Sequence, residues 1–129
     1  MVSKILFSFS FLVLSFLFIQ NSNAQSIIFS SQVNSDCVPT GTSKTFSMGS
    51  SGAEVCCIVN LKTETSENTS VTFDIFKNGV NDFSNSLDIP ARTNCFWQKL
   101  ILKVPAEWTV RALDSNGNII ASGTITVTE

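Results

Sequence analysis

The sequence predicts an all-β protein, an antiparallel β-sandwich of about seven to eight short strands. Three observations predict this class. Hydrophobic and polar residues alternate with a period of two over most of residues 26–128, which is typical of strands that bury one face. Turn residues, including Asn78-Gly79 and Asn116-Gly117, interrupt the alternation at intervals of about ten residues. No window of helical length carries apolar residues at the spacing i, i+3, i+4, i+7.

In the first half of the chain, the alternation predicts strands over residues 26–33, 44–48 and 53–61. Pro39-Thr40-Gly41 is predicted as a turn and residues 49–52 as a loop, because Pro and Gly favour turn conformations. On the third of these strands, every second side chain belongs to one apolar face, which is therefore the predicted core face: Val55, Cys57, Val59 and Leu61.

In the second half, residues 71–76 form a strand that leads into a predicted hairpin at Asn78-Gly79. Pro90 marks a strand end, because Pro donates no ladder hydrogen bond. Residues 108–113 and 119–127 form the last predicted hairpin. Between them and Pro90, residues 95–104 place four apolar side chains inward with Gln98 as the exception: Phe96, Leu100, Leu102 and Val104.

Residues 1–24 have the composition of a secretory signal peptide. Lys4 supplies the positive charge, an apolar run extends from Ile5 to Ile19, and small residues precede a cleavage site before Gln25. The apolar run is shorter than the roughly 20 residues that a membrane-spanning helix needs. We therefore predict that residues 25–129 form a single secreted, extracellular domain with no transmembrane segment.

Four cysteines, Cys37, Cys56, Cys57 and Cys95, belong to the predicted domain. An even number of cysteines in a small exported domain predicts disulfides, here two. Neighbouring residues of a strand point to opposite faces, so Cys56 and Cys57 are expected to seek different partners, one Cys37 and the other Cys95; which takes which stays open. A metal site is the alternative, but the chain has no His and adjacent cysteines suit zinc poorly.

The composition weighs against several functions. The net charge is −2, with 8 basic residues, so nothing indicates a nucleic-acid partner. The absence of His removes the commonest general base, and we expect neither enzyme activity nor a cofactor. A carboxylate pair such as Asp82 and Asp88 could cleave glycosides, but a sandwich of this size leaves little room for a substrate cleft.

Two local patterns indicate binding or modification. Trp97, Lys99 and Lys103 share the predicted outer face of their strand, and an exposed Trp beside basic groups can stack on a sugar ring or anchor a partner protein. These three residues are the candidate ligand-binding site, unless a loop or a second sheet covers Trp97. Asn68-Thr69-Ser70 matches the N-glycosylation acceptor and lies in a predicted loop.

The run LDIPARTNCFWQKLILKVPAEWTVRALDSNGNIIASGTITV, Leu87 to Val127, resembles the second half of an immunoglobulin-like or fibronectin-type-III-like extracellular module. The similarity lies in its I-P-A turn, its W-T-V-R strand and its D-S-N-G-N hairpin. The chain departs from antibody domains because it has no Tyr for a tyrosine corner and both Trp follow every Cys. The resemblance implies an immunoglobulin-like sandwich and no particular ligand.

Together these patterns predict a secreted, non-catalytic binding or adhesion module that recognises an extracellular glycan or protein. One alternative is a secreted effector, either an inhibitor with residues 41–52 as its rigid loop or a membrane-active toxin. The acidic balance weakens the toxin hypothesis. The other alternative is a structural component of an extracellular matrix, which the lack of Tyr for cross-linking weakens.

Overall fold

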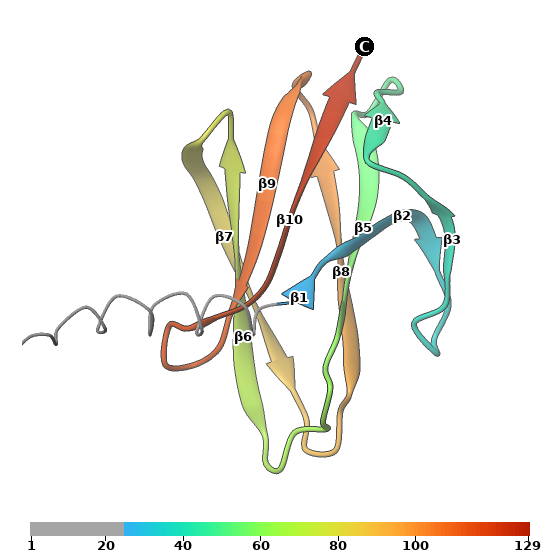
Figure 1. The fold of residues 1–129 in the computed structure, drawn as a ribbon. Coiled ribbons are helices and arrows are strands. Elements are labelled where there is room, and N and C mark those ends of the chain that lie inside the picture. The colour runs from blue at the N-terminus through green and yellow to red at the C-terminus, as the bar shows by residue number, and fades with distance from the viewer. Residues whose placement is uncertain (1–24) are drawn as a thin grey trace, which may run out of the picture.

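A computed structural model describes residues 25–129 of the chain. Within this range ten strands form two sheets that pack face to face, and no helix is present (Figure 1). The all-β class predicted from the alternation is therefore confirmed. The predicted signal peptide, residues 1–24, lies outside the described residues.

Seven of the strands have six or more residues, and the other three have two to four. The short ones account for the excess over the predicted number. In chain order the strands are β1 (Gln25–Ser26), β2 (Ile28–Val33), β3 (Pro39–Thr42), β4 (Thr45–Ser47), β5 (Ala53–Asn60), β6 (Thr69–Lys77), β7 (Val80–Ile89), β8 (Cys95–Leu102), β9 (Ala106–Leu113) and β10 (Ile119–Thr128).

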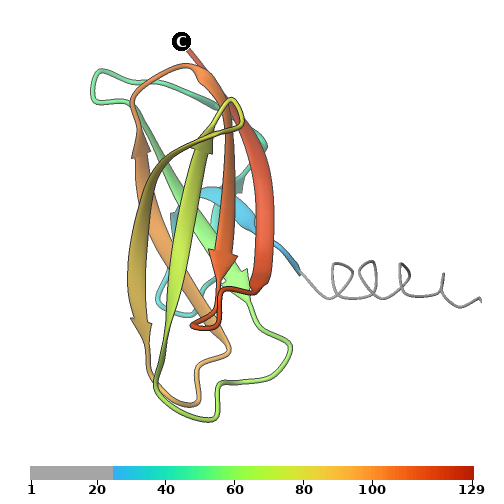
Figure 2. The same cartoon turned by 90° about the vertical axis from the view of Figure 1, so that its left-hand side faces the viewer.

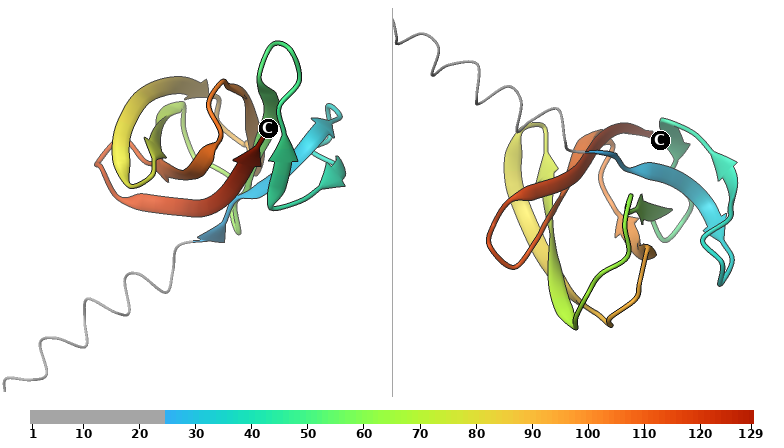
Figure 3. Two further views of the ribbon diagram at one scale, coloured as in Figure 1. Left: turned by 90° about the horizontal axis from the view of Figure 1, so that it is seen from above. Right: turned by 60° about the horizontal axis from the view of Figure 1, so that its bottom comes forward.

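The six-stranded sheet has the order β1-β10-β9-β6-β7, and β4 also pairs with β10. The four-stranded sheet has the order β3-β2-β5-β8, so β8 is one of its edges. All pairs are antiparallel except those of β1 and β4 with β10. Figure 2 faces the six-stranded sheet, with the four-stranded sheet behind it, and the view from above in Figure 3 shows the two layers end-on.

One hydrophobic core lies between the sheets and contains side chains from both. Val55 and Val59 of β5 and Phe73 and Val110 of the opposite sheet are fully buried. Phe73 also meets Phe96 of β8 edge-to-face, with 6.1 Å between the ring centroids. The core faces predicted for β5 and β6 are thus confirmed, because a period of two fixes which side chains a paired strand buries.

Turn chemistry explains two of the hairpins. Asn78 and Gly79 both have positive φ, 49° and 85°, which is the backbone that a two-residue hairpin turn requires. In the β9–β10 turn, the Asp114 carboxylate accepts hydrogen bonds from the backbone N–H groups of Asn116 and Asn118, each at 2.9 Å. Both turns lie where the sequence predicts them.

Two local predictions are wrong. Pro39-Thr40-Gly41 belongs to strand β3, and the turn lies earlier, where the Asn34 side-chain oxygen accepts hydrogen bonds from the N–H groups of Asp36 and Val38, each at 2.9 Å. Val104 is 43% exposed instead of facing the core. The reason is that β8 ends at Leu102, so the alternation of faces stops before Val104.

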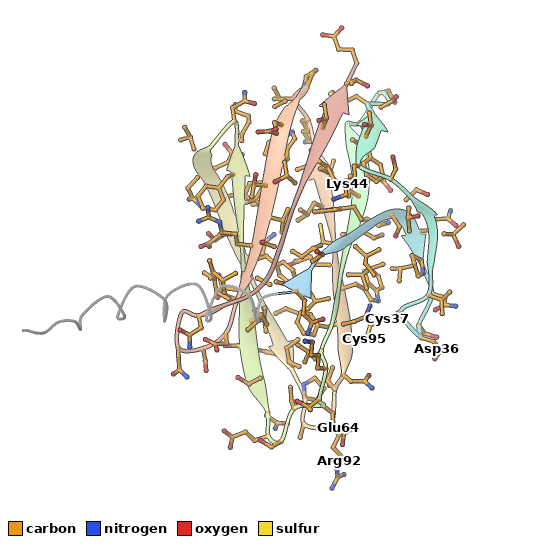
Figure 4. The ribbon with its side chains drawn as sticks, in the orientation of Figure 1. Asp36, Cys37, Lys44, Glu64, Arg92 and Cys95 are labelled. Carbon is orange, nitrogen blue, oxygen red and sulfur yellow. A yellow bond between two sulfur atoms is a disulfide. The ribbon has the colours of Figure 1, made fainter. Side chains whose placement is uncertain are left out.

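The prediction of two disulfides is also wrong. Cys37 is bonded to Cys95, with 6.4 Å between their Cα atoms, while Cys56 and Cys57 are free thiols (Figure 4). Cys57 faces the core and Cys95 the outer side of the four-stranded sheet, so these two cannot meet. Disulfides need Cα atoms within about 7 Å.

The register of β5 against β8 separates Cys56 from Cys95. Both point to the outer face, but Cys56 lies opposite Lys99, whereas Cys95 lies opposite Asn60. The offset is four residues, or roughly 13 Å along a strand. Cys95 is therefore left for Cys37, which the β2–β3 hairpin brings to the same face.

Candidate functional site

The outer face of β8 carries the exposed aromatic ring that the sequence singles out. Trp97 is 37% exposed and Ile101 is 47% exposed, and Lys99 lies between them on the same face. Trp97 lies opposite Ile58 of β5 in the ladder. Its side chain therefore points away from the core, as the alternation indicates, and its neighbours cover only part of it.

Trp108 shows what a core tryptophan looks like in the same molecule. It is 3% exposed, and its indole N–H donates a hydrogen bond to the carbonyl oxygen of Val104 at 3.0 Å. Buried indoles usually have such a partner for their polar edge. The contrast between Trp97 and Trp108 follows from their strands, because one side chain faces out of a sheet and the other into the core.

A second wall faces Trp97, and it comes from the β2–β3 hairpin. β2 pairs with β5 only at Ile28–Ser30, and beyond that point its ladder partner is β3 alone. The chain then passes over Cys56, whose Sγ lies 3.9 Å from the carbonyl oxygen of Ser31. Between hairpin and β8 lies a cavity of about 210 Å³, here called the hairpin groove, which is lined by Ser31, Gln32, Val33, Cys56, Trp97 and Lys99.

The disulfide joins the two walls of the hairpin groove. Cys37 lies at the turn end of the hairpin, and Cys95 lies on β8 two positions before Trp97. Figure 4 shows the two cysteines meeting beside the four-stranded sheet, on the side away from the six-stranded sheet. Cys37 has a φ of 63°, a left-handed conformation that non-glycine residues seldom adopt.

Cys56 forms the floor of the groove and is only 2% exposed. Burial raises the pKa of this thiol, and Glu54 adds to the rise, while the nearby Lys99 ammonium lowers it. The net effect is an upward shift, so the thiol is protonated at neutral pH. A protonated thiol is a weaker nucleophile than a thiolate.

The charges beside the groove cancel. The Lys99 ammonium lies 3.5 Å from the Glu54 carboxylate, and about half of each side chain is exposed. An ion pair with this much solvent around it contributes little to stability. Because Lys99 and Glu54 are paired with each other, neither presents an unpaired charge to a ligand in the groove.

Lys103 does not line the hairpin groove. It follows the last residue of β8, and its side chain lies beside Gly52, at the turn that precedes β5. The structure therefore brings together two of the three predicted ligand-binding residues, Trp97 and Lys99. It adds the hairpin residues 31–33, for which the sequence contains no signal.

Asn68 is exposed at the end of the loop between β5 and β6, while the other two residues of the predicted acceptor, Thr69 and Ser70, begin strand β6. Its side-chain oxygen accepts a hydrogen bond from the backbone N–H of Ala91 at 2.9 Å. A wider and more open depression of about 660 Å³ lies beside it. We favour the smaller hairpin groove as the binding site, because the depression has neither an aromatic nor a basic residue in its lining, which consists of Glu67, Asn68, Thr69, Ser70, Asp88, Ile89, Pro90 and Ser115.

The loop from Pro90 to Asn94 is braced against the β5–β6 loop, a feature that the sequence does not reveal. Arg92 donates its backbone N–H to the Thr65 carbonyl oxygen at 2.8 Å, and the Thr65 N–H bonds the Thr93 carbonyl oxygen at 2.9 Å. The Thr65 hydroxyl bonds the Pro90 carbonyl oxygen at 2.9 Å. These hydrogen bonds join the two loops at one end of the sandwich, from which Arg92 projects (Figure 4).

No protein-family model matches the chain, and no curated protein matches it. Within residues 25–129, none of the secondary structure is a helix long and apolar enough to cross a membrane. The same residues contain no group of three or more His, Cys, Asp or Glu side chains that could hold a metal ion. Function is therefore inferred from the hairpin groove itself.

Proposed function

We propose that this protein is a secreted, non-catalytic module of the immunoglobulin-like type that binds an extracellular glycan in the hairpin groove. The observation that carries the proposal is Trp97. It leaves 37% of a large aromatic side chain in water, at the side of a cavity that also contains Lys99 and the hairpin residues 31–33. An exposed aromatic ring beside a cavity with polar and basic groups can stack on a sugar ring, which favours a binding role.

The chemistry of the groove favours a neutral sugar. An indole ring offers an apolar face to the C–H side of a sugar ring, while polar groups such as Ser31 and Gln32 can bond its hydroxyls. Lys99 is paired with Glu54, so it does not select for an acidic sugar. The volume, about 210 Å³, is below the roughly 300–1,000 Å³ of most small-molecule pockets. A single ring or a chain end is the ligand that such a groove would accept.

The order of the strands supports the immunoglobulin-like part of the proposal. Constant-type immunoglobulin domains place strands A, B and E in one sheet and C, F and G in the other. Among the seven longer strands here, β2, β5 and β8 share a sheet, and β6, β9 and β10 share the other. β7 is the fourth of the seven longer strands in chain order. It departs from that scheme because it pairs with β6 in the six-stranded sheet rather than with β8 in the four-stranded sheet.

Secretion and glycosylation belong to the same proposal. The leader pattern of residues 1–24 supports export, and the Cys37–Cys95 disulfide is compatible with an oxidising compartment. Asn68 is exposed, and its hydrogen bond to Ala91 uses the side-chain oxygen, which leaves the amide nitrogen for a glycan. Asn68→Gln should remove one glycan mass from material secreted by a eukaryotic host.

The test is a glycan array that carries neutral and acidic glycans, probed with residues 25–129. We expect the wild type to bind neutral glycans, and Trp97→Ala to lose that binding. Ile101→Ala is the matched control, because Ile101 is exposed on the same face of β8 but does not line the groove. Absence of any bound glycan, or equal losses in both variants, contradicts the proposal. A protein ligand whose binding depends on Trp97 would favour the other partner class that the sequence predicts.

A further inference from the structure

We propose that the Cys37–Cys95 disulfide is a redox latch, which holds the β2–β3 hairpin against the four-stranded sheet and thereby keeps the hairpin groove formed. Reduction releases the hairpin, opens the groove and uncovers Cys56. The consequence for ligand binding rests on the glycan-binding function proposed above. The movement of the hairpin does not, and it is measured separately.

The hairpin has little else to hold it. None of residues 31–42 is buried, so the segment contributes almost no side chain to the core. Its ladder with β5 ends at Ser30. The hydrogen bonds at its turn are internal, because Asn34 bonds the N–H groups of Asp36 and Val38, and Ser31 bonds the carbonyl oxygen of Thr40. Segments with few buried contacts open at low free-energy cost.

The other end of the disulfide is on a firm element. β8 pairs with β5 at every position from Cys95 to Leu102, and its inward side chains, such as Leu100 and Leu102, are buried in the core. The bond therefore ties a weakly held hairpin to a well-held strand. Because Trp97 follows Cys95 by two residues on that strand, the same bond limits how far the hairpin wall can move from the Trp97 wall.

The redox step needs an external dithiol as the reductant. The dithiol gives up two electrons and two protons and leaves as its own disulfide, while the bond between the two sulfur atoms breaks and Cys37 and Cys95 become thiols. Both cysteines are partly exposed, so a reductant can reach them. After the bond is broken, residues 31–42 are attached to the sheet at their ends, by the weak hydrogen bond from the Cys56 thiol to the Ser31 carbonyl oxygen and by surface packing.

The two free thiols report the movement from inside the molecule. Cys56 is 2% exposed and lies beneath Ser31, whereas its neighbour Cys57 is fully buried between the sheets. Lifting the hairpin uncovers Cys56 alone. Unfolding of the whole sandwich uncovers both. Alkylation of the two cysteines therefore distinguishes a local opening from a loss of the fold.

The experiment measures the rate of alkylation by N-ethylmaleimide at neutral pH in single-thiol proteins. Cys56 is followed in a Cys57→Ala background and Cys57 in a Cys56→Ala background, each with the disulfide intact and with Cys37→Ser/Cys95→Ser. We expect loss of the disulfide to accelerate alkylation of Cys56 on the order of 100-fold, and we expect Cys57, which only unfolding of the whole sandwich exposes, to remain far slower than Cys56. If Cys56 stays equally slow, packing holds the hairpin and the latch is refuted. Alkylation of Cys57 as fast as that of Cys56 in the variant also refutes it, because both thiols are then exposed by unfolding of the whole sandwich.

Binding is compared on the same glycan array, before and after reduction by dithiothreitol. Loss of glycan binding on reduction, together with selective exposure of Cys56, supports the latch as the regulator of the groove. Selective exposure of Cys56 in a protein that binds no glycan supports the latch and overturns the glycan-binding function. Undiminished binding after reduction overturns regulation by the latch and leaves the proposed function in place.

Discussion

Truncation of the two tryptophans separates a binding role from a structural one. Trp97 is 37% exposed, so roughly two thirds of its surface, on the order of 100 Å² beyond what Ala would bury, leaves water on folding. At about 25 cal/mol per Å², Trp97→Ala should lower the free energy of unfolding by about 2.5 kcal/mol. The loss comes from contacts on the outer face, such as that expected with Ile58, its neighbour in the ladder.

Trp108→Ala should cost about twice as much. Trp108 is 3% exposed, and truncating a buried aromatic residue costs about 3–5 kcal/mol. The hydrogen bond from its indole N–H to the Val104 carbonyl oxygen is lost as well, which adds about 1 kcal/mol. Val104 is 43% exposed, so water can replace the lost donor and keep this second contribution small.

Urea unfolding followed by far-ultraviolet circular dichroism measures both losses without depending on tryptophan fluorescence. Ile101→Ala should cost less than about 1 kcal/mol, because Ile101 is 47% exposed on the same face as Trp97. Equal destabilisation by Trp97→Ala and Trp108→Ala would refute the reasoning. It would make Trp97 a structural residue, and any loss of glycan binding would then follow from unfolding.

Three further predictions concern stability. Cys37→Ser/Cys95→Ser should lower the free energy of unfolding in urea by about 4 kcal/mol, because the disulfide closes a loop between cysteines 58 residues apart and so restricts the unfolded chain. A loss below about 1 kcal/mol would contradict this entropic estimate. Gly123→Ala should lower the free energy of unfolding, followed by thermal denaturation, by about 1–3 kcal/mol, since the added Cβ would lie 2.6 Å from Cε2 of Phe29. An unchanged midpoint would show that the Phe29 ring can move aside. Burial raises the pKa of the Cys57 thiol above its ordinary value of 9.0, so the native state keeps a proton that the unfolded chain loses, and stability should fall above pH 9 by about 1.4 kcal/mol per pH unit. Cys57→Ala should make that fall shallower, and an identical slope in the variant would exclude Cys57 as its cause.

Local patterns predict the strands and their buried faces well. Val71, Phe73 and Ile75 are buried as the alternation requires, because a strand with one side in the core repeats every two residues whatever its partners are. Asn78-Gly79 predicts its hairpin equally well, since the turn depends on the conformations of the two residues themselves. The outward direction of Trp97 comes from the same alternation.

The hairpin groove is not a local property, and for this reason the sequence does not predict it. It exists because β2 stops pairing with β5 after Ser30 and continues with β3 alone, so that residues 31–33 lie over Cys56 and opposite Trp97. The place where one strand leaves another depends on the twist and length of the whole sheet. Residues 31–33 read in the sequence as the end of an ordinary strand.

The cysteines show where alternation fails to decide and register takes over. In the structure Cys57 faces inward and Cys95 outward, which excludes a bond between them. Alternation allows a bond between Cys56 and Cys95, because sliding β5 past β8 by four residues keeps every side chain on its own face. In the observed register Cys95 lies opposite Asn60 instead, and it is free to bond Cys37. A slide that joined Cys56 to Cys95 would leave the hairpin without its tether and Trp97 without its second wall, so the register of one pair of strands determines both the disulfide and the groove.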